Sequence, residues 1–106
     1  MEASSRLDKL RKMLDAEPGD AFCLYAIAQE HARLGDANEA IAWFDRTIAA
    51  DPTHAYARFH KAKVLEGLGR IPEAIECLRE GLAAAESARD GKAASELAGA
   101  LASLAP

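Results

Sequence analysis

The sequence has few aromatic side chains, two cysteines and no long hydrophobic run. Aromatic residues make up 6% of its 106 residues although 50% are hydrophobic, and alanine supplies much of this hydrophobic half. Because alanine favours helix and buries little area, the composition is typical of closely packed helices rather than of a sheet sandwich. No segment reaches the roughly 20 apolar residues that cross a membrane. The charged opening stretch, MEASSRLDKLRK, lacks the apolar core of a signal peptide.

The sequence also lacks the residue patterns that are typical of metal sites, redox sites and nucleic-acid-binding surfaces. Cys23 and Cys77 stand alone, without CxxC spacing or neighbouring histidines, so they predict no zinc site of about four clustered ligands. We expect free, buried thiols in a reducing cytoplasm. The formal net charge of −4 is spread along the chain, with no basic face for nucleic acid. Since a phosphate-binding glycine loop and metal-ligand spacing are missing, we predict no enzyme and no cofactor.

A short motif occurs twice, as LGDANEAI in residues 34–41 and as LGRIPEAI in residues 68–75, 34 residues later. The same offset aligns Tyr25 with Phe59 and Ala28 with Ala62. Self-similarity at this fixed period is the signature of a helical solenoid. The chain is therefore predicted to consist of repeated helix–turn–helix units.

Each unit has its own start and stop signals. In the first unit, apolar residues recur on one helical face and Gly35 then ends the helix, since glycine tolerates the left-handed conformation. Asp36 is predicted to cap the following helix, and Asp51-Pro52 to end it. Small residues mark the closest approach of the two helices, where larger side chains would push them apart. They are Ala28 and Ala40 in the first unit and Ala62 and Ala74 in the second.

The two ends carry atypical units. Ser5 and Asp8 have the spacing of a capping box at the start of a first helix, and residues 94–104 reproduce the apolar spacing of a repeat's first helix. Solenoids need such terminal units to cover their last apolar faces. Six helices are therefore predicted, over residues 5–16, 21–33, 37–50, 54–67, 72–87 and 92–104.

These residues resemble the tetratricopeptide repeat over nearly the whole chain. The first copy carries the family pattern as Leu24, Ile27-Ala28, His31, Ala40, Phe44, Thr47 and Pro52. The second reads Arg58, Lys61-Ala62, Leu65, Ala74, Leu78, Gly81 and Glu86, with glutamate where proline is expected. The resemblance implies an all-α fold, a short right-handed α–α superhelix (a solenoid) of about six antiparallel helices. It divides a single domain, residues 1–106, into a half-repeat (4–20), two repeats (21–54 and 55–88) and a capping helix (91–105).

Two basic residues of the second copy, Arg58 and Lys61, occupy positions that are normally apolar. Long basic side chains can bury their stems and bring their charges to the surface, so we expect the fold to tolerate them. The missing proline predicts that the last helix of this unit continues to about Ser87.

In the tetratricopeptide repeat family, outward positions of the first helices line a concave ligand groove. The resemblance therefore implies a peptide-binding face with four aromatic residues. The implied groove residues are Phe22, Tyr25, Gln29, Arg33, Tyr56, Phe59, Lys63, Glu66 and Lys92, with the small Ala32 at one further groove position.

Two features qualify this groove. Aromatic side chains are enriched at binding hot spots, but Tyr25 and Phe59 also stand where family members often have aromatics that pack between helices. One subgroup clamps a terminal carboxylate with Lys and Asn residues. Because Tyr25, Gln29 and His60 occupy those places here, we expect no such clamp.

The sequence favours a non-catalytic interaction module that binds a peptide segment of a partner protein in the groove. A self-associating unit such as a homodimer is the first alternative, because so short a stack can bury its open face against a copy of itself. Trp43 would suit such a contact. A fragment of a longer repeat scaffold is the second alternative. We expect neither nucleic acid nor membrane as a partner, and the sequence does not identify the protein that is bound.

Overall fold

The computed structural model describes residues 2–105, with side chains from Ser5 onward. It contains six helices: α1 (Glu2–Ala16), α2 (Ala21–Arg33), α3 (Ala37–Ala50), α4 (Ala55–Gly67), α5 (Ile71–Ser87) and α6 (Gly91–Leu104). The predicted all-α fold is confirmed, and only the start of α1 differs from its predicted bound by more than one residue. Within residues 2–105, the structure has no helix of the length and apolarity that a membrane crossing requires.

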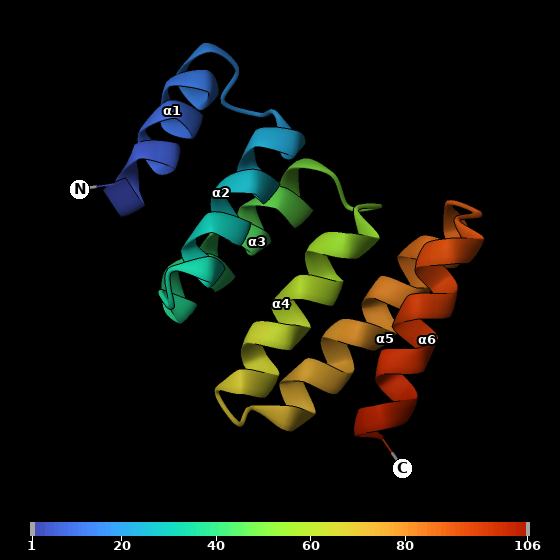
Figure 1. Ribbon diagram of the computed structural model, residues 1–106. Coiled ribbons are helices and arrows are strands. Elements are labelled where there is room, and N and C mark those ends of the chain that lie inside the picture. Colours follow the sequence, from blue (N-terminus) through green and yellow to red (C-terminus); the bar gives the residue numbers. More distant parts are fainter. Residues whose placement is uncertain (1, 106) are drawn as a thin grey trace.

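Consecutive helices run antiparallel and pack in chain order, from α1 at one end to α6 at the other (Figure 1). The first helices of successive units touch, α2 with α4 and α4 with α6, and so form one layer. α3 contacts both α2 and α4, and α5 contacts both α4 and α6. Each of these second helices therefore closes the seam between two members of the first layer.

Three turns of the same type join α2 to α3, α4 to α5 and α5 to α6. In the first, the Gly35 N–H donates to the Ala32 carbonyl at 3.1 Å and the Asp36 N–H to the His31 carbonyl at 2.9 Å. This is a Schellman motif, which satisfies the last carbonyls of a helix by a residue at positive φ. Gly35 and Gly69 fill that place at φ of 83° and 77°, as predicted, whereas Arg89 fills it in the third turn at 56°.

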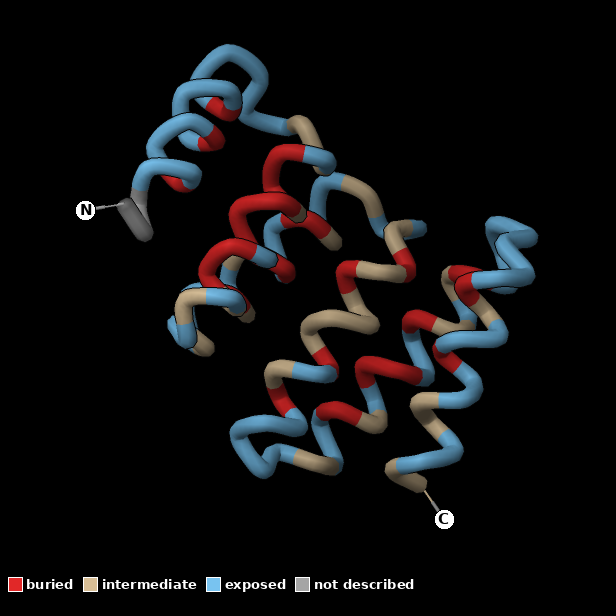
Figure 2. Tube along the Cα trace, in the orientation of Figure 1, coloured by how far each residue is buried: buried red, intermediate tan, exposed pale blue. Residues whose placement is uncertain are grey.

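The four small residues predicted at the helix crossings are buried. Ala28 and Ala40 are fully buried in one apolar cluster with Phe44, while Ala62 and Ala74 belong to a second cluster with Leu78. Figure 2 shows the buried positions recurring along the inner sides of neighbouring helices. Since these alanines permit the close contact, the predicted register of the repeat is confirmed by their burial.

Gly81 in α5 lies where three helices come closest together. A Cβ atom at this position would stand 2.9 Å from Cδ2 of Leu97 in α6 and 3.2 Å from Cβ of Arg58 in α4. Real Cβ atoms rarely approach neighbours so closely, so α5 reaches both partners because this residue has no side chain. A Cβ atom added to Gly99, in α6, would instead meet no atom within 4 Å.

Two capping predictions were wrong. Ser5 lies inside α1, which begins at Glu2, because no glycine or proline stops the helix before it. Asp36 occupies the N-cap of α3 but makes no capping hydrogen bond, since its carboxylate lies instead 3.4 Å from Nδ1 of His31. The N-caps that do bond are Asp20 of α2, His54 of α4 and Asp90 of α6.

The two basic residues at apolar positions behave as predicted. The side chain of Arg58 is 15% exposed, and its Nη1 donates to the Pro52 carbonyl at 2.6 Å. Nζ of Lys61 lies 2.6 Å from Oδ1 of Asp45 in α3. Both side chains are partly buried, and Nε of Arg58 is itself buried with no hydrogen-bond partner among the described residues. The continuation of α5 to Ser87 is also confirmed.

Candidate functional site

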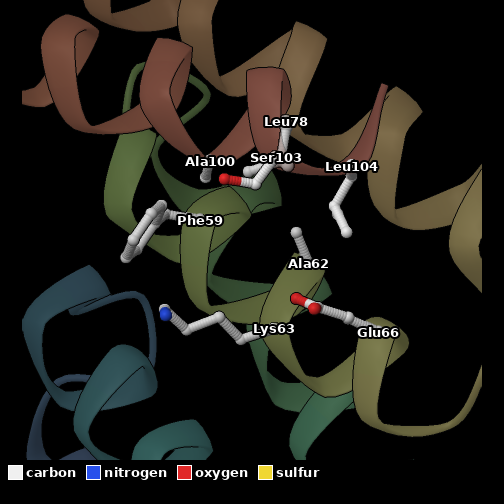
Figure 3. Close-up of a pocket in the computed structure, with 8 residues that line it drawn as sticks. All are labelled: Phe59, Ala62, Lys63, Glu66, Leu78, Ala100, Ser103 and Leu104. Carbon is white, nitrogen blue, oxygen red and sulfur yellow. The ribbon is translucent and has the colours of Figure 1, made fainter. Parts of the chain in front are cut away.

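A hollow of about 250 Å³ opens between α4 and α6 and contains three of the predicted groove residues, Phe59, Lys63 and Glu66 (Figure 3). Its other walls are apolar or small. Leu78 forms the floor from α5, and Ala100, Ser103 and Leu104 form the side that belongs to α6. We call this feature the α4–α6 hollow.

A second hollow of about 330 Å³ lies on the other flank of α4, between that helix and the α2–α3 turn. We call it the α2–α4 hollow. Its lining is small or apolar except for Lys63, which also lines the α4–α6 hollow. The lining residues are Ala32, Gly35, Ala37, Lys63, Val64, Gly67 and Leu68.

The two hollows are built from equivalent positions of successive helices. Glu66 in the α4–α6 hollow lies 34 residues after Ala32 in the α2–α4 hollow. The α6 wall of the first hollow consists of Ala100, Ser103 and Leu104. Each of these residues lies 36 positions after its counterpart in the α4 wall of the second hollow, which consists of Val64, Gly67 and Leu68. The lining of α6 is therefore shifted by two residues from the 34-residue period. Each seam between two first helices leaves the same kind of opening.

Gln29 and Arg33 line a separate depression, of about 400 Å³, between α1 and α2. Its centre is the buried carboxylate of Glu30, which accepts a hydrogen bond of 3.0 Å from Nε of Arg33 and lies 3.5 Å from Nε of Arg6. The hydrogen bond from Arg33 lowers the pKa of Glu30. Arg33 is therefore occupied by a carboxylate of the chain itself, and this depression is a structural ion-pair network.

Tyr25 packs between helices, as aromatic residues at this position of the repeat often do. Its ring lies 4.5 Å from that of His54, 5.9 Å from that of His60 and 6.1 Å from that of Phe44. Burial raises the pKa of Tyr25 to about 12. The same surroundings lower the pKa values of His54 and His60, mainly through burial. These four rings join α2, α3 and α4.

The remaining predicted residues differ in exposure. Phe22 at the start of α2 is 71% exposed, and Lys92 is exposed at the start of α6. Tyr56 is half-buried: its ring meets Phe59 edge-on, and its hydroxyl donates to Oε1 of Glu96 at 2.6 Å. That hydrogen bond raises the pKa of Tyr56 to about 12. Tyr56 therefore links α4 to α6 beside the α4–α6 hollow.

Trp43 is half-buried against the apolar cluster of α1 and α2. The guanidinium carbon of Arg46 lies 4.1 Å from the centre of its ring, and the His31 ring stacks on it at 6.4 Å. Trp43 is therefore partly covered by contacts within the chain.

The two cysteines lie in the interior of the helix stack. Burial raises the pKa of the Cys77 thiol to about 11, so this group is not a thiolate nucleophile at neutral pH. Both cysteines are buried and free, and their Sγ atoms lie 3.1 Å and 3.4 Å from backbone carbonyls of Leu10 and Arg58. In the part of the chain whose side chains are described, no three His, Cys, Asp or Glu residues gather as a metal site would require.

The family of the chain is shown by its relatives. Residues 2–81 match the family model described as anaphase-promoting complex, cyclosome, subunit 3, a model of tetratricopeptide type. A tetratricopeptide repeat domain protein from Salinibacter ruber, solved by NMR, is 32% identical with a TM-score of 0.78, over 84% of this chain and 90% of that one. The chain belongs to the tetratricopeptide repeat family.

Two curated proteins are also similar to this tetratricopeptide repeat protein. One is the tetratricopeptide repeat and J domain-containing co-chaperone DNJ1 of Fusarium oxysporum, 41% identical over 46% of this chain. The chain spans only 9% of the length of that co-chaperone. The other is an uncharacterized protein of Methanocaldococcus jannaschii, 39% identical over 56% of this chain and 69% of that protein. Tetratricopeptide repeat families are typically non-catalytic.

Two solved complexes share the fold of this tetratricopeptide repeat protein at low identity. PcrH in complex with the chaperone binding region of PopD has a TM-score of 0.88 at 15% identity, over 97% of this chain and 78% of that chain. The TPR2B domain of yeast Sti1 in complex with pHsp70 has a TM-score of 0.87 at 23% identity, over 94% of this chain and 80% of that chain.

Several residues of the tetratricopeptide repeat site were not found from the sequence. Val64, Leu68 and Leu104 line the hollows, although none of them is among the groove residues that the family resemblance implies. Each one faces the seam toward the preceding first helix, where it lines a hollow. The one signal in the sequence is that Leu104 stands 36 residues after Leu68, which is close to the repeat period.

Proposed function

We propose that the chain is a non-catalytic protein-interaction module that binds a peptide segment of a partner protein across α2, α4 and α6. The observation that carries this proposal is the α4–α6 hollow, which contains Phe59, Lys63 and Glu66 together. A concave site with apolar walls and a few polar groups is the usual form of a ligand pocket. The hollow repeats on both flanks of α4, so an elongated ligand fits better than a compact one.

The solved complexes give independent support. One is PcrH with the chaperone binding region of PopD, and the other is the TPR2B domain of Sti1 with pHsp70. Both proteins share the fold over more than nine-tenths of this chain. Peptide binding by that fold makes the same function the most economical proposal for this chain.

The mode of binding differs from a carboxylate clamp. Tyr25 and His60 stand where a clamp has basic or amide side chains, and both are taken up by the ring contacts that join α2, α3 and α4. We therefore assign recognition to the two hollows rather than to a terminal carboxylate.

The experiment is a selection of peptides from a random display library on the immobilised chain, followed by affinity measurement on purified variants. Ser103→Trp places a large side chain in the α4–α6 hollow without removing any core residue. Ser87→Trp is the matched control, since Ser87 is exposed at the end of α5. We expect selected peptides to bind Ser103→Trp about tenfold more weakly or worse than wild type, because hot-spot contacts are worth about 2 kcal/mol.

The Ser87→Trp control should bind the selected peptides as the wild type does. A selection that enriches no peptide over an unrelated helical protein would remove the proposed function. Equal loss of affinity in both tryptophan variants would move the binding surface away from the hollow.

A further inference from the structure

Lys63 stands between two equivalent openings. Its side chain lines the α2–α4 hollow on one flank of α4 and the α4–α6 hollow on the other. Its Nζ lies 4.9 Å from the centre of the Phe59 ring. In Figure 3 this nitrogen points away from the Glu66 carboxylate.

Lys63 has no carboxylate partner among the residues whose side chains the structure describes. Among the residues whose side chains the structure describes, no carboxylate lies within ion-pair distance of its Nζ, whereas Lys61, two residues earlier, pairs with Asp45 at 2.6 Å. The ring of Phe59 attracts the ammonium group but leaves its N–H donors free. An acidic group of a ligand above Lys63 would therefore gain a charge-assisted contact.

Other groups restrict where such an acid can lie. Glu66 lines the α4–α6 hollow, so a second carboxylate inside that hollow would be repelled. Apart from Lys63 at its edge, the α2–α4 hollow is lined by Val64, Leu68 and small residues, whose side chains offer an acid no hydrogen-bond donor. Each hollow therefore favours an apolar side chain, and the position between them favours an acidic one.

The geometry of an extended peptide matches this arrangement. Alternate side chains of an extended segment point to the same face, and residues four apart are separated by about 13 Å. A helix with its side chains is about 10–12 Å across. Two apolar residues four apart can therefore straddle α4, with the residue midway between them above Lys63.

We propose that the ligand is an extended segment of a partner protein with an acidic residue midway between two apolar residues four apart. The apolar side chains enter the α2–α4 and α4–α6 hollows, and the carboxylate pairs with Lys63. This inference rests on the proposed function and specifies the class of segment that the groove accepts.

The test uses three fluorescein-labelled peptides titrated to millimolar chain concentration, with anisotropy as the readout. The first is Gly-Ser-Leu-Ser-Glu-Ser-Leu-Ser-Gly, the second replaces its Glu with Gln, and the third places the two Leu residues side by side. Lys63→Met keeps the stem that lines both hollows and removes the charge. Lys12→Met is the matched control, since Lys12 is an exposed lysine of α1.

We expect the wild type and Lys12→Met to bind the Glu peptide about two- to fivefold more tightly than the Gln peptide, the upper part of the range for an exposed ion pair. Lys63→Met should bind the two peptides equally, and the peptide with adjacent Leu residues should bind weakest to every variant. The same Glu preference in Lys63→Met, or equal binding of the adjacent-Leu peptide, would overturn the inference. Failure of all three peptides would also overturn it. The proposed function would still stand if the random library yields peptides that Ser103→Trp rejects.

Discussion

Replacement of Gly81 by alanine tests the close approach of α4, α5 and α6. Alanine in a helix interior gains about 1 kcal/mol over glycine from backbone propensity alone. Here the new Cβ would stand 2.9 Å from Cδ2 of Leu97 and 3.2 Å from Cβ of Arg58. The Leu97 methyl group can rotate only within a fully buried site, and Cβ of Arg58 moves only with its backbone.

The two effects oppose each other, and packing should win. Overpacking of a well-packed site costs about 1–3 kcal/mol, so Gly81→Ala should lower the free energy of unfolding by about 1 kcal/mol after the gain in propensity. Gly99→Ala is the matched control: it makes the same change inside α6, where the added Cβ meets nothing within 4 Å. That variant should be more stable than wild type by up to about 1 kcal/mol.

Urea unfolding followed by circular dichroism measures both changes, with the wild-type slope as a check that the same surface is exposed. The two variants should have midpoints on opposite sides of the wild type. In a domain of this size about 1 kcal/mol corresponds to roughly 4–8 °C in melting temperature. Equal stabilisation by both alanines would mean that α5 does not approach its neighbours as closely as the structure places it.

Three further predictions concern packing, protonation and thiol access. Ala28→Leu or Ala62→Leu should lower the free energy of unfolding by about 1–3 kcal/mol in urea melts, because each alanine is buried at a helix crossing; unchanged melts would place them at the surface. Burial lowers the pKa values of His54 and His60 from 6.5. Their contribution to the free energy of unfolding is therefore fully present above pH 6.5 and is lost as the pH falls from 6.5 toward the pKa values of the folded state. Urea midpoints between pH 7.5 and 5 should therefore decline, and His60→Leu should flatten the decline; a wild-type midpoint constant over this range would contradict the burial of these rings. Cys23 and Cys77 are buried with raised pKa values, so an aromatic disulfide reagent should modify them far more slowly in the native chain than in guanidinium chloride.

Most of the fold could be predicted from the repeat period, because the residues that end each helix and permit each crossing lie close together in the sequence. Gly35 and Gly69 end helices through their own backbone conformation, and the neighbouring small residues specify the crossing in the same stretch of chain. The third turn was harder to place. Its left-handed residue is Arg89 and not the nearby Gly91, since the Schellman hydrogen bonds determine which residue takes positive φ.

The site was less predictable because it depends on side chains from different repeats. Tyr25 occupies a groove position, yet it is held by His54, at the end of its own repeat, and by His60 from the following repeat. Val64 and Leu68 have the periodicity of packing residues and become lining residues only where neighbouring helices diverge. A pattern along one helix gives the direction of a side chain but not the distance to the next helix.

The chain-order packing of the helices also has a kinetic consequence. In residues 2–105 each helix contacts only helices one or two places away along the chain, and α1 contacts α2 alone. Such local topology gives a low contact order, for which folding in microseconds to milliseconds is typical. Since every unit is stabilised by its immediate neighbours, opening should begin at the two ends and proceed inward. Amide hydrogens of α1 should therefore exchange before those of α3 and α4. α1 can detach while the layer formed by α2, α4 and α6 stays intact.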